Sequence, residues 1–393
     1  MHSLAIAHGE PHLQVIPFTT QLWSVIGSDW DALLLRCRSS SAFMSSAWIR
    51  RWLAVFGDTM RPDTLIWRDG NGAVVAICLL TIRRERRGPF TVRRAYLNAT
   101  GEHQVASEHN IILCFPDCAS FVSASVIAYV RARRVDSIMM SGFGSDSIDC
   151  IERLWPTNGI ARGFASEDRF VALDALRTSG ASYDSSLSRS TREQIRRSIR
   201  IYTKEYGEPI VEVAGSPQVA EDWLVQLRAL HQQRWNARGQ GGAFATKHVM
   251  EFHTMLVREN GGSHGEANEL RVDLVRVRFG DTVIGLLYNL CTDGCISFYQ
   301  SGLLYSDDNR CKPGLVTHAL TIQHYLNGDA SEYDFLAGDP STIRYKESLG
   351  PQSRKLFWRE FMFPTLKMRL IERLRALRPQ RIAGIGGESG PAE

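Results

Sequence analysis

A basic turn that leads into a helix pattern is the part of this sequence with the clearest chemical meaning. Arg310 and Lys312 stand directly before Pro313-Gly314, and an apolar-periodic run begins at Leu315. Because Pro and Gly break the preceding chain, the first backbone N–H groups of the helix have no partner within it. Such N–H groups, placed beside two cations, attract an anion. We therefore predict an anion-binding site made by residues 310 and 312–315.

Side chains that can exchange protons stand on both sides of this turn. The candidate bases are Asp334, Asp339 and Glu347, and the candidate acids are Tyr299, Tyr305 and Tyr345. Together with Lys346, they suit acyl transfer from a phosphate-bearing thioester carrier, in which a nucleophile loses a proton and a thiolate gains one. The sequence does not choose among them. Asp334 also fits a cap at a strand end, Tyr299 a core residue and Lys346 a surface lysine, so these alternatives stay open.

The elements that must position these groups follow a regular order in the second half of the chain. The sequence predicts a hairpin across Gly280-Asp281, a third strand over 295–303, a helix from residue 314 and a strand over 332–338. A slot between the third and fourth strands would take the amide arm of the carrier. We expect Ser301-Gly302 to form a bulge that exposes backbone groups beside this arm.

The first half shows the same order of elements. It has a hairpin across Asp69–Gly72, strand patterns over 91–98 and 109–114, a helix over 118–134 and a strand over 137–143. The segment before its helix, CFPDCAS, has neither glycine nor a basic residue. We therefore predict an α/β fold with mixed sheets in two duplicated units, of which only the second keeps the anion site. The predicted divisions are 1–180, 181–362, a helix over 363–379 and a disordered tail over 380–393.

Two basic helix patterns lie outside this repeat. Arginines at 192, 196, 197 and 200 fall on one helix face, where a solvated surface is favoured over an anionic ligand. Near the C-terminus, basic residues flank an apolar stripe made by Leu366, Leu370, Leu374 and Leu377. Packing of this stripe against its own domain is the favoured interpretation, and peripheral contact with an anionic membrane surface is the alternative.

Composition narrows the class of protein. With 393 residues, 44% of them hydrophobic and 22% charged, the chain suits two soluble globular domains. No leader pattern and no long apolar run occurs, so we expect a cytoplasmic protein. The eight cysteines lack disulfide-framework or zinc-finger spacing, which predicts reduced thiols and no metal. A net charge of +4 is too mild to predict a DNA partner.

Three motifs in order carry a family resemblance. They are SLSRSTREQIRRSIRIYTKEYG, HQQRWNARGQGGAF and KPGLVTHALTIQHYLNGDASEYDFLAGDPSTIRYKESLG. Over residues 183–358 the sequence resembles the CelD/BcsL family of the GNAT acetyltransferase superfamily. The resemblance implies two tandem GNAT-like units, the first degenerate, with Pro313-Gly314 at the pyrophosphate turn. It also implies an active-site block made by Asp334, Gly338, Asp339, Tyr345 and Lys346. It further implies an acceptor cleft lined by His231, Arg234, Trp235 and Phe244.

The resemblance implies an acyltransferase. The donor would be acetyl-CoA or another acyl-CoA, and the acceptor an amine or hydroxyl of a small molecule or saccharide, as in polysaccharide biosynthesis. Two departures stand out, because Arg310 lies four residues before Gly314 and Val316 replaces the second small residue of the usual GNAT signature. Two other functions therefore stay open. One is a Fem-type transferase that uses aminoacyl-tRNA, and the other is a GNAT-like binding or regulatory protein without turnover.

Overall fold

The chain forms two compact units. The computed structural model describes residues 11–37, 41–101, 105–237, 239, 242–244, 246–262, 269–337 and 343–376. The N-terminal unit contains the described residues up to 37, residues 43–165 and the segment from Leu356 onward. The C-terminal unit contains the described residues between Ser166 and Lys355. Each unit combines a mixed sheet with helices, as the sequence predicts.

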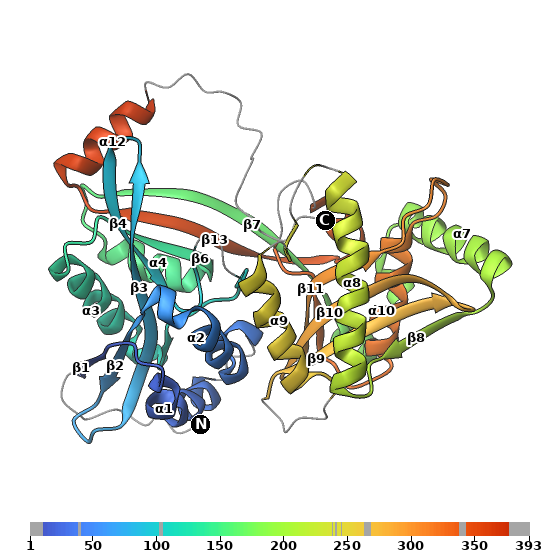
Figure 1. Ribbon diagram of the computed structural model, residues 1–393, viewed down its shortest axis with the longest axis horizontal. Helices are drawn as coiled ribbons and strands as arrows, with labels where there is room; N and C mark the ends of the chain where they lie inside the picture. Colours follow the sequence, from blue (N-terminus) through green and yellow to red (C-terminus); the bar gives the residue numbers. More distant parts are fainter. Residues whose placement is uncertain are drawn as a thin grey trace. The chain divides into compact units, whose positions relative to one another are not determined.

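The N-terminal unit places helices on a sheet of mostly antiparallel strands (Figure 1). Its strands are β1 (His12–Ile16), β2 (Asp63–Arg68), β3 (Val74–Arg87), β4 (Phe90–Leu97), β5 (Leu113–Cys114), β6 (Ser137–Gly144) and β13 (Gln352–Met362). Its helices are α1 (Leu22–Cys37), α2 (Ser46–Met60), α3 (Ala119–Ala132), α4 (Ser145–Leu154) and α12 (Leu366–Ala376). The strand order is β1-β2-β3-β4-β6-β13, and β4 pairs with β6 in parallel.

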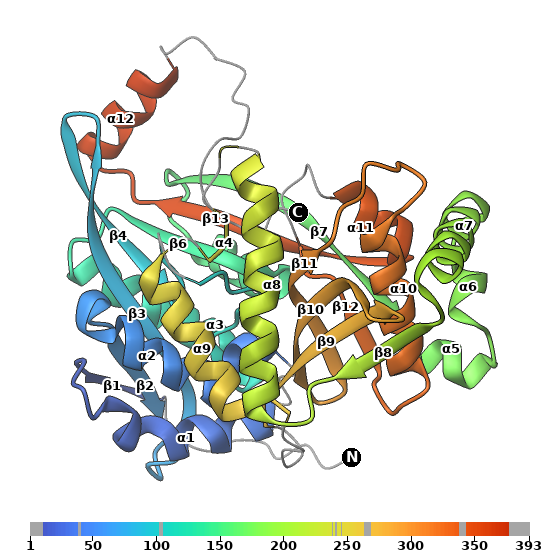
Figure 2. The same cartoon turned by 45° about the vertical axis from the view of Figure 1, so that its right-hand side comes forward.

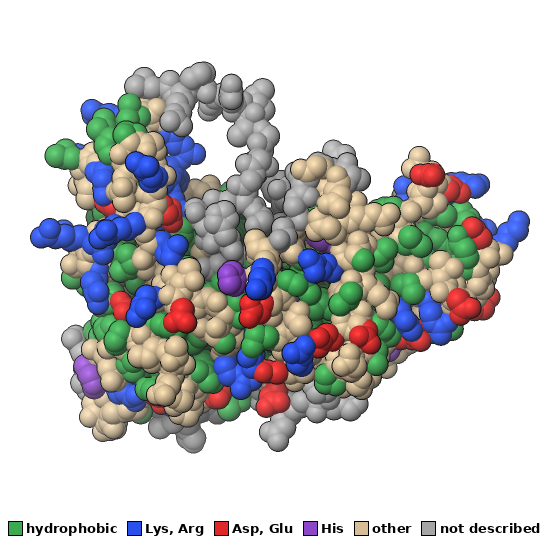
Figure 3. All heavy atoms as spheres, viewed as in Figure 1, with side chains coloured by type: hydrophobic (Ala, Val, Ile, Leu, Met, Phe, Trp, Pro, Cys, Tyr) green, Lys and Arg blue, Asp and Glu red, His purple; other side chains and the backbone are tan. Residues whose placement is uncertain are grey.

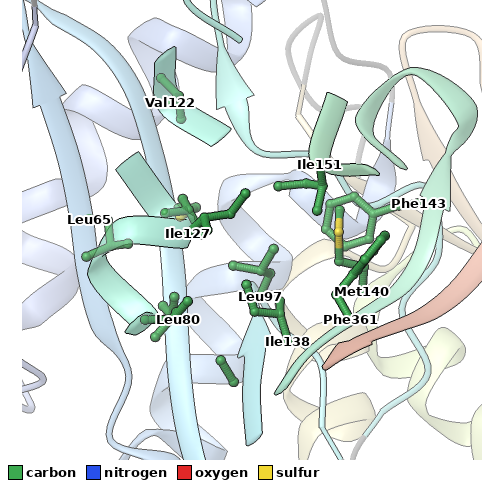
Figure 4. Close-up of a cluster of buried hydrophobic side chains, with 14 of the residues drawn as sticks. Leu65, Leu80, Leu97, Val122, Ile127, Ile138, Met140, Phe143, Ile151 and Phe361 are labelled. Carbon is green, nitrogen blue, oxygen red and sulfur yellow. The ribbon is translucent and has the colours of Figure 1, made fainter. Parts of the chain in front are cut away.

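Turn chemistry and apolar burial account for this unit. The Asp69 side chain accepts hydrogen bonds from the N–H groups of Asn71 and Ala73, and Gly72 has φ of 83°, which together close the β2–β3 hairpin. The hairpin predicted across this turn is therefore confirmed. Side chains from the sheet, α3 and α4 then form one core (Figure 4), which includes Leu65, Leu80, Leu97, Val122, Ile127, Ile138, Met140, Phe143, Ile151 and Phe361.

The C-terminal amphipathic helix does not pack as the sequence predicts. Helix α12 buries Met368 and Ile371 against Val92 and Met362. Its leucine row stays exposed, with accessible fractions of 86% for Leu366, 45% for Leu370 and 43% for Leu374. The prediction that this row covers its own domain is therefore wrong, because the neighbouring row of the helix carries the packing. In Figure 3, Lys and Arg side chains gather at this end of the unit. Leu377 and the predicted tail lie outside the described residues.

The C-terminal unit repeats the architecture. Its strands are β7 (Ile160–Ala172), β8 (Pro209–Val213), β9 (Arg271–Phe279), β10 (Thr282–Thr292), β11 (Cys295–Leu303) and β12 (Glu332–Asp334). Its helices are α5 (Leu173–Ser179), α6 (Tyr183–Ser186), α7 (Arg189–Tyr206), α8 (Pro217–Ala237), α9 (Lys247–Asn260), α10 (Pro313–Leu326) and α11 (Ile343–Leu349). The strand order is β8-β9-β10-β11-β12-β7, and β11 pairs with β12 in parallel.

Helices cover both faces of this second sheet (Figure 2). Neighbouring residues on β10 show the two faces, because side chains alternate along a strand. Leu287 belongs to the core that α10 closes with Ala319 and Ile322, whereas Tyr288 contacts His253 of α9. Helices α7 and α10 therefore lie on one face, and α8 and α9 on the other.

The duplication predicted from the sequence is present in the fold. The order strand, strand, strand, helix, strand appears as β9-β10-β11-α10-β12 in the C-terminal unit. It appears as β2-β3-β4-α3-β6 in the N-terminal unit, where the short strand β5 lies between β4 and α3. In both, the strand after the helix pairs in parallel with the third strand of the series, β11 or β4. The predicted α/β fold with mixed sheets is thus confirmed. Among the described residues, no helix has the length and apolar character needed to span a membrane.

Candidate active site

The predicted anion turn lies at the start of α10. Lys312 caps the helix, and Pro313 occupies its first position. The first hydrogen bond of this helix start runs from the Val316 N–H to the Lys312 carbonyl at 3.0 Å. The N–H groups of Gly314 and Leu315 precede that bond, so they are available to a ligand. The sequence thus placed this helix start correctly.

Helix α7 holds the turn in place. The hydroxyl of Ser198 donates to the carbonyl of Arg310 at 2.7 Å and accepts from the N–H of Lys312 at 3.2 Å. Ser198 is fully buried, so these bonds fix the backbone directly before the helix start. Neither residue type nor spacing marks Ser198 for this role, because the contact joins residues far apart in the sequence.

Arg310 is engaged in an ion pair beside this turn. Its guanidinium bonds both carboxylate oxygens of Asp308, with Nη2 at 2.7 Å from Oδ2. The Arg310 guanidinium, helped by Arg197 of α7, lowers the pKa of Asp308 to about 2. Because 67% of the Arg310 side chain is exposed, the pair is open to exchange with a ligand anion. Lys312 is half-buried next to it.

A bulge interrupts β11 at Tyr299. Tyr288 of β10 pairs with Gln300 and the next residue, Asn289, pairs with Phe298, so Tyr299 is the extra residue. The bulge predicted at Ser301-Gly302 is therefore misplaced by two residues. Gly302 has a different use, since a Cβ atom there would lie 2.5 Å from the carbonyl oxygen of Leu227 on α8. The absence of a side chain at Gly302 therefore allows α8 to approach the strand closely, and the bulge lies elsewhere.

An open strand edge follows the bulge. β12 pairs with Cys295–Ser297 of β11 and ends at Asp334, whereas β11 continues to Leu303. Among the described strands, residues 298–303 of β11 pair with β10 alone. This stretch therefore has an edge without a partner among the described strands, at which the N–H and carbonyl of Ser301 are already bonded by the side chains of Gln300 and His231.

Asp334 and Lys346 hold the turn that leaves β12. The Asp334 carboxylate accepts from the Leu336 N–H at 2.6 Å, and Leu336 adopts φ of 58°. The buried ammonium of Lys346 donates to the carbonyls of residues 335, 336 and 337 at 3.0, 3.1 and 3.3 Å. These contacts are structural, and they shape the chain where it separates from β11. Gly338 and Asp339, the next residues of the predicted block, lie outside the described residues.

Arg354 of β13 binds three carboxylates at the base of this turn. It lies 2.5 Å from Asp168, 2.8 Å from Glu332 and 2.6 Å from Asp334. Cys295 lies close enough to Glu332 and Asp334 for the three to resemble a metal-ligand group. Both carboxylates of this group, however, already bond the Arg354 guanidinium, and burial raises the pKa of the Cys295 thiol well above its ordinary value. The donor set therefore suits an ion pair better than a metal.

Aromatic rings connect Tyr299 to the predicted acceptor cleft. The ring of His253 lies 5.0 Å from Tyr299 and 5.5 Å from Phe244, measured between centroids. Phe244 in turn lies 5.4 Å from His231, whose ring is tilted against that of Trp235 at 5.8 Å. Three of the four predicted cleft residues thus meet in one cluster with Tyr299.

The remaining predicted residues lie at two separate places. The guanidinium of Arg234 lies over the ring of Tyr305 at 4.5 Å, at the edge of a surface hollow between α8 and β11. Tyr345 of α11 is half-buried, with its ring 6.0 Å from that of His318 on the α10 face. Tyr299 thus contacts the α9 side of the sheet, and Tyr345 contacts the α10 side.

His253 predicts a pH-dependent stability. Burial lowers its pKa from 6.5 to about 3, so the unfolded chain binds a proton in this range and the folded chain does not. Stability should fall as the pH falls below 6.5. Between these two pKa values the wild-type protein should lose roughly 1.4 kcal/mol of unfolding free energy for each pH unit, and we expect His253→Phe to lack this loss. Urea unfolding between pH 7 and 4 measures the unfolding free energy of both proteins. The same pH dependence in wild type and variant would contradict the claim that His253 causes the loss.

Part of the C-terminal unit matches a known domain model. The family model of the acetyltransferase (GNAT) domain matches residues 189–347, from the start of α7 into α11. The region that carries the anion turn and the open strand edge is therefore similar to GNAT acetyltransferase domains. No curated protein matches the sequence.

Solved structures share the fold of about nine tenths of the chain at low sequence identity. A conserved protein of unknown function from Bacteroides thetaiotaomicron has a TM-score of 0.53 at 10% identity, covering 90% of this chain and 100% of that one. The C-terminal domain of a putative lysylphosphatidylglycerol synthetase from Agrobacterium fabrum has a TM-score of 0.51 at 11% identity, covering 89% and 95%. L-PGS from Bacillus licheniformis has a TM-score of 0.50 at 11% identity, covering 90% and 97%. These similarities concern the fold alone.

Proposed function

We propose that the C-terminal unit transfers an acyl group from acyl-CoA, with acetyl-CoA as the simplest donor, to an amine or hydroxyl of a small molecule or saccharide. One observation carries the proposal. The N–H groups of Gly314 and Leu315 precede the first bond of α10 at a turn fixed by Ser198, within the region that matches the GNAT domain model. A pyrophosphate suits this site, because free N–H groups and the helix dipole both favour an anion.

The chemistry would follow from the neighbouring elements. The carrier's amide arm would lie along the open edge of β11 and bring its thioester to the bulge at Tyr299. The acceptor would enter from the α8 side and attack the thioester carbonyl, while the Tyr299 hydroxyl gives a proton to the departing thiolate. The resulting tyrosinate would take back a proton from the acylated amine or hydroxyl, so that the acceptor's proton ends on the CoA thiol and Tyr299 is restored. Holding both reactants together would supply much of the rate enhancement. A building block of a surface polysaccharide is one acceptor of the required kind.

Calorimetry with acetyl-CoA and with a longer acyl-CoA tests this proposal. We expect saturable binding of one molecule per chain, with release of free CoA when an amine acceptor is added. Absence of binding for both carriers would overturn the proposal. Binding without any CoA release across an acceptor panel would favour a regulatory GNAT-like protein.

The Asp308–Arg310 ion pair gives a further prediction. Asp308→Asn should tighten acetyl-CoA binding about threefold, because it frees Arg310 for the carrier phosphates and removes a like charge. Asp307→Asn is the matched control, since it removes the same charge from the exposed neighbouring residue. If calorimetry finds that both variants change acetyl-CoA affinity equally, the cause is the change in net charge. Arg310 then does not contact the carrier.

An aminoacyl-tRNA-dependent transfer is the second candidate. The observation that favours it is the exposed Arg197 and Arg200 on α7, the helix that holds the anion turn. Contacts of these cations with tRNA phosphates would make binding weaken steeply with salt. Salt-dependent tRNA binding, together with no acyl-CoA binding, would support this candidate against the first.

A further inference from the structure

We propose that helix α12 attaches the protein to an anionic lipid surface through its leucine face. This face consists of Leu366, Leu370 and Leu374 together with Arg369 and Arg373. The proposal concerns an interaction surface of the N-terminal unit, so it does not depend on the acyl transfer proposed for the C-terminal unit. The position, the anchoring and the charge of the helix each support it.

The three leucines form a continuous apolar stripe along α12. They lie four residues apart, and each such step turns the helix by only about 40° beyond a full turn. Met368 and Ile371, the buried residues of the helix, face another side. The stripe therefore stays outside when the helix packs, and 86% of Leu366 is exposed. An apolar stripe bordered by charged residues is typical of a surface that meets another molecule.

Ion pairs hold the helix with this stripe outward. Lys367 donates to the Asp136 carboxylate at 2.5 Å and to the Thr91 carbonyl at 3.0 Å. On the other flank of the packed side, Glu372 accepts from Arg162 at 2.7 Å. The helix is therefore formed and oriented before it meets a lipid surface, so binding would not have to order it.

The charges beside the stripe select the kind of surface. Arg369 and Arg373 are exposed and form a second row next to the leucines. Glu372, the one acidic residue of the helix, lies on the side away from the leucines and is paired with Arg162. The leucine face is thus both apolar and basic. Such a face inserts leucines among lipid chains while its arginines meet anionic headgroups.

A second copy of the chain or another protein fits this face less well. A two-fold contact between copies would bring the arginines of both helices together, and they would repel each other. A stable protein interface also takes about 800 Å² from each partner. An 11-residue helix is roughly 16 Å long and about 10 Å wide, so its exposed face supplies only part of that area. A lipid surface requires no matching shape.

Sedimentation with lipid vesicles tests the proposal on the full chain. The vesicles consist of phosphatidylcholine alone, or of phosphatidylcholine and phosphatidylglycerol in a two-to-one ratio. We expect the protein to bind the anionic vesicles about tenfold more tightly than the neutral ones. Equal binding to both kinds of vesicle, or binding to neither, would overturn the proposal.

Replacing leucines by glutamine tests the apolar part of the face. The double variant Leu366→Gln, Leu370→Gln should bind the anionic vesicles about tenfold more weakly, because it removes the inserted side chains and keeps every charge. The matched control is Leu35→Gln, Leu154→Gln, which changes two exposed leucines elsewhere in the same unit and should bind like the wild type. Wild-type binding by the first variant would show that the lipid meets another surface and would overturn the proposal.

Replacing arginines tests the charge of the face. Arg369→Gln, Arg373→Gln should lose most of the preference for anionic vesicles, whereas Arg131→Gln, Arg134→Gln, at exposed positions after α3, should keep it. Equal losses in the two variants would mean that net charge alone attracts the vesicles, which contradicts a role of α12.

Light scattering tests the other occupant. We expect no dimer that depends on the leucine face. A wild-type dimer that dissociates in Leu366→Gln, Leu370→Gln would show that a second copy covers this face, and it would overturn the proposal.

Discussion

Replacing Gly314 by Asp is expected to raise the dissociation constant of acetyl-CoA about 100-fold while the fold is kept, a change equivalent to about 2.7 kcal/mol. The added carboxylate would occupy the helix start and repel the carrier phosphates. It would not harm the helix, because an acidic side chain in the first turn interacts favourably with the dipole. The nearest neighbour of the new Cβ is Leu303 Cδ1 at 3.3 Å, the end of a flexible side chain.

The N-terminal unit offers a matched control for this variant. Gly144 caps α4, and a Cβ atom there meets nothing within 4 Å. Gly144→Asp therefore places the same charge at another helix start, and we expect unchanged acetyl-CoA affinity. Calorimetry measures both variants, and melting curves check their folding. Wild-type affinity in a folded Gly314→Asp protein would show that the carrier does not bind at α10.

Replacing Tyr299 by Phe is expected to lower kcat about 100-fold, the lower range for losing a general acid. The Michaelis constant for acetyl-CoA should change little, because the ring and its packing against His253 are retained. The rate of CoA thiol release in the presence of an amine acceptor measures the effect. Loss of kcat without loss of binding is the expected result for a group that acts on the leaving thiolate.

Tyr288→Phe is the control within the same cluster. Tyr288 is fully buried, and its hydroxyl lies 3.2 Å from Nδ1 of His253. Losing this bond should cost about 1 kcal/mol of stability and leave kcat near the wild-type value. A wild-type kcat in Tyr299→Phe, or an equal loss of kcat in both variants, would show that Tyr299 contributes to packing and not to proton transfer.

Local patterns predicted those features that a few neighbouring residues determine. Asp69 and Gly72 define a hairpin through their own hydrogen bonds and backbone angles, and Pro313-Gly314 ends one segment and begins α10. The order of elements was visible twice, which is why the duplicated fold could be predicted. The Asp308–Arg310 pair was not predicted, although a single position separates its two residues.

Features that depend on tertiary contacts could not be predicted in this way. Arg354 meets Asp168 across 186 positions of sequence, and Ser198 meets Arg310 across 112. The position of the bulge in β11 depends on its register with β10, which composition does not encode. The exposed leucines of α12 show the reverse case, since a neighbouring row of the same helix packs instead.

A crystal structure of the protein with acetyl-CoA tests the central claim most directly. We predict that the pyrophosphate oxygens lie about 3 Å from the backbone nitrogens of Gly314 and Leu315, with the carrier's arm along residues 298–303 of β11. A pyrophosphate bound away from the start of α10, at α3 of the N-terminal unit or at any other surface, would contradict the account.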